Sequence, residues 1–308
     1  MHRHEDEVKF VTSNSRQMHI PKGKLIIIGG SVDVGSFSEN PSDLKRSLKF
    51  FEKGILKRIT TESAKNNLSR FEIITTASSI PEEVGDEYIK AFAQLDVKNV
   101  GVLNIKTREE ANSNANIERL VNADVVMFTG GDQLRLSSIF GGTSFHHLLL
   151  EKYENANFII AGTSAGAAAS SNNMIYQGSS HEALLKGEVK ITGGLGFINN
   201  VIVDTHFVQR GRIGRLMYAC ASNPINLGIG LGEDTGLLIT NGNYMEAIGS
   251  GLVMLVDATH MRDTNMTDVE MGNPVSIEHL ICHVMTLGDF YDLKHKKLTI
   301  RHKMAEVE

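Results

Sequence analysis

The chain is poor in the residues that define disulfide-rich and metal-binding proteins. Among its 308 residues there are no tryptophans, five prolines and two cysteines. Cys220 and Cys282 are too few for a disulfide framework and too far apart for a metal or redox motif. We therefore expect two buried thiols in a reducing compartment.

Long hydrophobic runs and an excess of basic charge are also missing. No apolar stretch reaches the eighteen or so residues of a membrane span, and the charged first residues contain no apolar core of signal-peptide length. The net charge of -5 disfavours general binding to nucleic acids or acidic membranes. The composition predicts a soluble, cytoplasmic protein with neither kind of partner.

What is present is an ordinary globular composition, 41% hydrophobic and 22% charged, in which apolar strand patterns alternate with helical ones. Strands are expected at 24–30, 71–76, 99–105 and 124–131, and helices at 45–58, 81–95, 117–123 and 145–153. This alternation predicts an α/β fold whose mainly parallel sheet carries helices on both faces.

Beyond residue 172, short strands separated by glycines predict β-hairpins that pack on the same core. No linker-like composition divides the chain. We expect one domain over 21–308, preceded by a flexible polar arm over 1–20.

The most informative stretch follows the apolar run that ends at Ile160. Residues 162–166, Gly-Thr-Ser-Ala-Gly, fit the G-x-S-x-G pattern of a nucleophile elbow, a strained strand-to-helix turn that needs small residues. A small-residue helix start would look the same, but the position after a buried strand favours catalysis. Ser164 is the candidate nucleophile.

A nucleophilic serine needs a base and an acid that orients the base. His206 ends an expected strand whose carboxyl end should meet the edge of the sheet that carries Ser164, and it is the candidate base. Two acids can serve it. Asp204 lies two residues earlier on the same strand, whereas Glu182 would complete the order serine, acid, histidine that is typical of this elbow.

An oxyanion site and a substrate pocket complete the predicted site. The backbone N–H of Ala165 follows the nucleophile, and the glycine pair 130–131 provides a second candidate donor at Gly131, from which Gln133 would reach into the site. The arginines Arg210, Arg212 and Arg215 follow His206 directly. In an acidic chain they are well suited to bind substrate carboxylates through bidentate hydrogen bonds.

Together, these motifs resemble the cyanophycinases, a serine peptidase family that also contains aspartyl dipeptidases. The likeness rests on GTSAGA around Ser164, GGDQ at 130–133, DTHFVQRGRIGR at 204–215 and GEDTG at 232–236, and it extends from about residue 24 to the last strands. It implies a flavodoxin-like, class I glutamine-amidotransferase-like three-layer α/β sandwich, a homodimer, and no cofactor or metal.

The resemblance also implies the roles of particular residues. It places the catalytic triad on Ser164, Glu182 and His206, and so favours Glu182 over Asp204 as the orienting acid. The implied substrate-binding residues are Gln133, Asp204, Thr205, Arg210, Arg212 and Arg215.

The implied reaction is exopeptidase hydrolysis of cyanophycin, an arginine-substituted polyaspartate, to β-Asp-Arg dipeptides. Asp132 and Thr205 stand where Asn and Gln are common in the family, and both are expected to border the substrate. Two alternatives remain: an aspartyl or isoaspartyl dipeptidase of the same family, and a non-catalytic binding protein that retains the fold.

Overall fold

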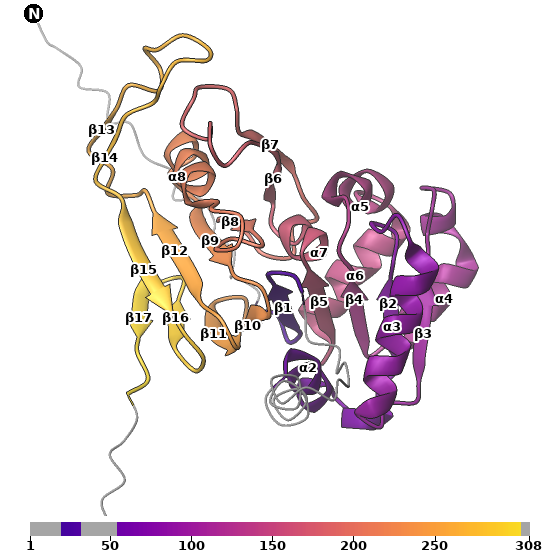
Figure 1. Cartoon of the computed structure of the whole chain (residues 1–308). Coiled ribbons are helices and arrows are strands. Elements are labelled where there is room, and N and C mark those ends of the chain that lie inside the picture. Colours follow the sequence, from indigo (N-terminus) through magenta and orange to yellow (C-terminus); the bar gives the residue numbers. More distant parts are fainter. Residues whose placement is uncertain (1–19, 32–53, 303–308) are drawn as a thin grey trace, which may run out of the picture.

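The computed structural model describes residues 20–31 and 54–302 (Figure 1). The predicted polar arm, apart from its last residue, and most of the predicted helix 45–58 lie outside these ranges.

A mixed nine-stranded sheet forms the centre of the molecule. Its five-stranded parallel half has the order β1-β5-β4-β2-β3, and antiparallel strands extend it beyond β1 in the order β10-β11-β16-β17. The strand bounds are β1 Lys24–Ile28, β2 Phe71–Ile74, β3 Val100–Leu103, β4 Val125–Phe128, β5 Ile159–Thr163, β10 Thr235–Thr240, β11 Tyr244–Gly249, β16 Phe290–Asp292 and β17 Lys297–Thr299. The α/β prediction is confirmed, although only part of the sheet is parallel.

Helices cover both faces of the parallel half because its strands are apolar on both sides (Figure 1). In β1, Ile26 and Ile28 belong to the core formed with α2 (Ile55–Glu62) and α3 (Pro81–Gln94). Leu25 and Ile27 belong to the opposite core. That core includes side chains of α4 Asn114–Asn122, α5 Gln133–Phe140, α6 Ser144–Asn155 and α7 Ala165–Ala169. The sequence pattern did not predict α5. The residue before this helix, Asp132, caps it by accepting a hydrogen bond from the Leu134 N–H.

A second sheet has the order β15-β12-β9-β8, with bounds β8 Val201–Asp204, β9 Leu227–Leu231, β12 Val253–Asp257 and β15 Ile281–Met285. One face joins the core of the central sheet through side chains such as Ile229 and Leu255, while α8 (Ile213–Ser222) packs on the other. The predicted hairpins occur as β10–β11, β6 (Asn173–Gln177) with β7 (Lys190–Gly193), and β13 (Asp263–Thr264) with β14 (Ile277–Glu278).

The pairing of β8 with β9 matters most for the site. These strands are parallel neighbours, so their carboxyl ends emerge side by side. The His206 N–H, just beyond β8, donates to the Gly29 carbonyl beyond β1 at 2.7 Å, and the Ser164 N–H donates to the Ile28 carbonyl at 2.9 Å. The two sheets therefore bring their strand ends together at one place.

Two further expectations can be compared with the described residues. Cys220 is buried but Cys282 is exposed, so the prediction of two buried thiols is wrong for Cys282, which lies on the edge strand β15. No helix within 20–31 or 54–302 is long and apolar enough to cross a membrane.

Candidate active site

The candidate nucleophile Ser164 occupies a strained turn between β5 and α7. Its backbone angles are φ 51° and ψ -108°, a region that residues with a side chain rarely adopt. The flanking glycines allow the close packing of this turn, because a Cβ on Gly162 would lie 2.5 Å from the Gly166 carbonyl carbon and one on Gly166 would lie 2.6 Å from the Phe128 oxygen. The predicted strand–elbow–helix geometry is present.

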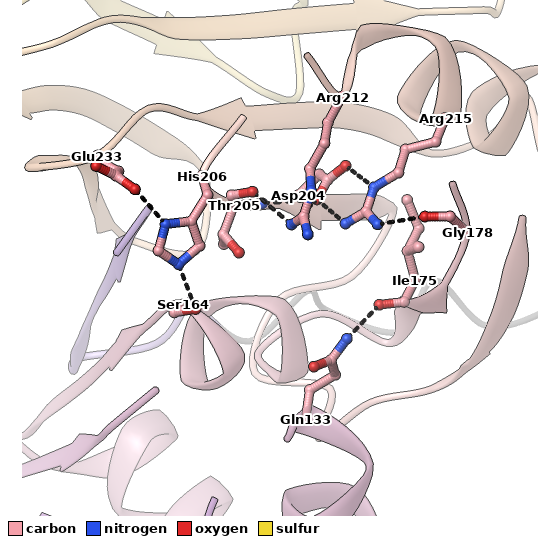
Figure 2. Close-up of polar contacts among 10 residues, drawn as sticks. All are labelled: Gln133, Ser164, Ile175, Gly178, Asp204, Thr205, His206, Arg212, Arg215 and Glu233. Carbon is pink, nitrogen blue, oxygen red and sulfur yellow. Dashed lines mark hydrogen bonds and ion pairs between the residues drawn. The ribbon is translucent and has the colours of Figure 1, made fainter. Parts of the chain in front are cut away.

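The candidate base His206 lies against this serine. Its Nε2 is 2.9 Å from the Ser164 Oγ. Figure 2 marks this contact with a dashed line. Gly30 makes room for the imidazole, since a Cβ at this residue would lie 2.3 Å from the ring Cε1. With a carboxylate at its Nδ1, the ring donates from Nδ1 and can accept the serine proton at Nε2.

The carboxylate beside the Nδ1 of His206 belongs to Glu233, not to Glu182. The Oε1 of Glu233 lies 2.7 Å from the imidazole Nδ1 (Figure 2), whereas Glu182 is exposed in the connection between β6 and β7. Asp204, the other candidate, is also engaged elsewhere. The placement of the orienting acid at Glu182 or Asp204 therefore does not hold in this structure.

The parallel pairing of β8 with β9 brings Glu233 to His206. His206 follows β8 by two residues and Glu233 follows β9 by two residues, so both side chains emerge at the same edge. The chain order is thus serine, histidine, acid. The available signal was the GEDTG motif at 232–236, which contributed to the resemblance without a role being given to its glutamate.

The surroundings of Glu233 favour its ionised form. The hydrogen bond with His206 makes the largest contribution to lowering the pKa of Glu233 below its usual 4.5, and a hydrogen bond from the Ser31 side chain and the nearby charge of Arg210 act in the same direction. The side chain is 34% exposed, so water reaches this carboxylate as well. A base held by an ionised carboxylate is suited to accept a proton from Ser164.

The glycine pair after β4 lies beside the nucleophile. A Cβ on Gly130 would lie 3.4 Å from the Cβ of Ser164. Gly131 has φ 136° and packs closely on the loop after β2, since a Cβ at Gly131 would lie 2.0 Å from the Ala77 oxygen. Both Gly131 and Ala165 line the cavity in front of Ser164. Their predicted role as oxyanion donors remains a prediction that fits this arrangement.

Asp204 and two of the three arginines form an internal ion-pair network (Figure 2). Arg215 donates to both carboxylate oxygens of Asp204, from its Nε at 2.6 Å and from its Nη2, and to the Gly178 carbonyl at 3.2 Å. Arg212 donates from Nη1 to Asp204 at 3.2 Å and to the Thr205 carbonyl at 2.7 Å. Asp204 and Arg215 are buried, so they neutralise and hold one another.

The remaining positive charge is therefore carried by Arg210 and Arg212. Burial lowers the pKa of Arg212 to about 10, against the opposing effect of Asp204 and together with the charges of Arg215 and Arg210. Arg210 is exposed. Three guanidinium groups against the single carboxylate of Asp204 make the wall of the cavity cationic.

The cavity in front of Ser164 has a volume of about 210 Å³. Gln133 lines it and uses its Nε2 to donate to the Ile175 carbonyl at 3.0 Å, which leaves the amide oxygen for another partner. The cavity residues are Gly131, Gln133, Ser164, Ala165, Ala168, Ile175, Tyr176, Asp204, Thr205, His206, Arg210, Arg212 and Arg215. Every predicted site residue except Glu182 is among them.

Asp132, one of the two departures from the pattern, serves as the N-cap of α5. Because Asp and Asn cap helices about equally well, this substitution has a structural explanation. Thr205 is buried and lines the cavity. In the part of the chain that the structure describes, no group of three or more His, Cys, Asp or Glu side chains is placed to hold a metal ion.

Comparison with known proteins gives concordant results. The family model described as Peptidase family S51 matches residues 48–246. A protein of Trichormus variabilis named cyanophycinase is 36% identical over 221 residues, which cover 72% of this chain and 74% of the relative. A cyanophycinase of Geminocystis herdmanii is 36% identical over 222 residues, covering 72% and 82% of the two chains.

Among solved structures, a peptidase from an acI-B1 Actinobacterium is similar with a TM-score of 0.54 and 20% identity, covering 89% of this chain and 98% of that one. At this identity the likeness supports the fold alone.

Proposed function

The chain belongs to peptidase family S51, and from the chemistry of its site we propose that it is a serine-type exopeptidase that hydrolyses cyanophycin to β-Asp-Arg dipeptides. The observation that carries the proposal is the hydrogen-bonded series Ser164–His206–Glu233, whose first two residues line a cavity together with three arginines. The names of the relatives supply the substrate, and the charge of the cavity is compatible with it.

The proposed reaction begins with attack of the Ser164 Oγ on the scissile carbonyl carbon. His206 takes the serine proton at Nε2, while ionised Glu233 stabilises the imidazolium that forms. The N–H groups of Ala165 and Gly131 would stabilise the tetrahedral oxyanion. The C–N bond then breaks, the amine leaves with the proton from His206, and water activated by the same base releases the acyl group from Ser164.

Charge complementarity supports the aspartyl substrate. A β-Asp-Arg unit at a chain end carries free carboxylates, which the guanidinium groups of Arg210 and Arg212 can bind with charge-assisted hydrogen bonds. Asp204 is already neutralised by Arg215. We therefore assign Asp204 and Arg215 to shaping the cavity and Arg210 and Arg212 to binding the substrate.

Incubation of the purified protein with insoluble cyanophycin, followed by mass spectrometry of the soluble products, tests the proposal. We expect β-Asp-Arg from the native protein and none from the Ser164→Ala variant. Longer fragments would indicate internal cleavage. Turnover of α- or β-aspartyl dipeptides without attack on the polymer would favour the dipeptidase, and equal activity of the alanine variant would contradict the serine mechanism.

The predicted homodimer remains a separate proposal. Light scattering coupled to size-exclusion chromatography would give the mass directly; the 33.8 kDa of one chain would contradict it.

A further inference from the structure

The acid of the proposed triad stands on a short segment without regular structure between β9 and β10. Each end of this segment is held by backbone hydrogen bonds: the Gly232 N–H donates to the Leu252 carbonyl at 3.2 Å and the Asp234 N–H donates to the Gly30 carbonyl at 2.9 Å. Glu233 itself lies between them. Its N–H donates instead to a side chain, the Oε1 of Gln209, at 3.2 Å.

Gln209 belongs to the same tight turn as the candidate base. Within that turn the Arg210 N–H donates to the His206 carbonyl at 3.0 Å and the Arg212 N–H donates to the Phe207 carbonyl at 3.0 Å. The backbone from which Gln209 projects is therefore fixed relative to His206. Its amide oxygen connects this turn directly to the segment that carries the acid.

The carboxylate of Glu233 needs such support because it is not enclosed. Its side chain is 34% exposed, and among the described residues its hydrogen-bond partners include His206 and the Ser31 hydroxyl. Packing alone cannot hold a partly solvated carboxylate in one orientation, so the position of its backbone decides how well it meets the imidazole.

We propose that Gln209 is a positioning residue for catalysis, which holds Glu233 at the Nδ1 of His206 by accepting the Glu233 backbone N–H. The proposal rests on the proposed role of Ser164, His206 and Glu233. The role of Gln209 goes beyond the proposed triad, because its side chain does not line the cavity and the sequence pattern gave it no role.

The test compares two variants of similar size. Gln209→Met removes the acceptor, whereas Gln209→Glu keeps an acceptor oxygen at the same reach. Loss of one modest hydrogen bond should lower kcat of the methionine variant roughly 3- to 10-fold with little change in KM, and the glutamate variant should recover most of the rate. Val208→Ala, at an exposed neighbouring residue, is the matched control and should behave as the native protein.

A double-mutant cycle separates positioning from general damage to the turn. In a Glu233→Gln background, Gln209→Met should cost less than twofold, because the carboxylate that Gln209 positions is gone. Equal losses in the methionine and glutamate variants, or a full and independent loss in the Glu233→Gln background, would overturn the proposal.

A readout that needs no natural substrate keeps this test apart from the substrate proposal. Phenylmethylsulfonyl fluoride sulfonylates an activated serine: a bond forms between Ser164 Oγ and sulfur, fluoride leaves, and His206 takes the proton. The rate of labelling should fall in Gln209→Met by the same factor as kcat. Labelling that also occurs in Ser164→Ala would refute the triad itself, whereas Ser164-dependent labelling at the native rate in Gln209→Met would refute only the role of Gln209.

Discussion

The site geometry predicts that replacing Glu233 lowers kcat strongly, whereas replacing Glu182 does not. Glu233→Gln replaces the carboxylate at 2.7 Å from the His206 Nδ1 by a neutral amide of the same shape. The amide cannot stabilise the imidazolium that forms when Ser164 gives up its proton, so kcat should fall while KM changes little. Glu182→Gln changes the same residue type at an exposed position and serves as the control.

The expected size of the loss follows from the exposure of Glu233. Loss of a hydrogen bond to a charged group costs about 1.5 to 3 kcal/mol, which corresponds to roughly 10- to 150-fold in rate. A fully enclosed triad acid can be worth about 10⁴. Because the Glu233 side chain is 34% exposed and water can compensate in part, we expect a loss of about 10² in kcat.

Steady-state kinetics on cyanophycin or an aspartyl dipeptide, together with circular dichroism to establish folding, would measure this difference. Glu182→Gln should retain near-native kcat. If Glu182→Gln loses two decades and Glu233→Gln retains its activity, the acid that orients His206 during turnover is not the one found beside it here.

Three further predictions concern the same site. Gly30→Ala should lower kcat about 10²-fold in an otherwise folded protein, because its Cβ would lie 2.3 Å from the His206 ring and displace it; a near-native kcat would contradict this steric role. Arg210→Lys should raise KM roughly tenfold with little change in Tm. Arg215→Lys breaks the buried pairing with Asp204 and should lower the free energy of unfolding by about 1.5 to 3 kcal/mol in urea titrations. The reverse pattern would exchange the roles of the two arginines. Because the pKa of Glu233 is lowered below 4.5, ionised Glu233 should contribute stability that is fully present above about pH 4.5 and is lost as the pH falls through the lowered pKa. The difference in Tm between the native protein and Glu233→Gln should therefore be constant at neutral pH and shrink in acid. A difference that grows in acid would contradict this prediction.

Features encoded in short stretches of sequence could be predicted without the structure. The elbow around Ser164 is such a feature, because the strand, the strained turn and the helix follow one another within ten residues and demand small side chains at fixed positions. The alternation of strands and helices likewise predicted the α/β fold. Helix α5 was missed because the sequence QLRLSSIF has only a weak helical pattern, and the cap at Asp132 resembles an ordinary turn.

Features that depend on which strands become neighbours could not be predicted in the same way. His206 and Glu233 are 27 residues apart, and they meet because β8 pairs in parallel with β9 after the chain has passed through α8. Glu182 is closer to His206 in sequence and fits a familiar order, yet the chain carries it into an exposed connection.

The division of labour among the arginines has the same origin. The sequence by itself determined that three guanidinium groups follow the base, and hence that the site is cationic. Only the tertiary structure decided that Arg215 pairs with Asp204 while Arg210 lines the cavity. The first turn of α8 directs Arg215 inward, to the end of β8. Local sequence specifies which groups are available; the packing of distant strand ends specifies which of them touch.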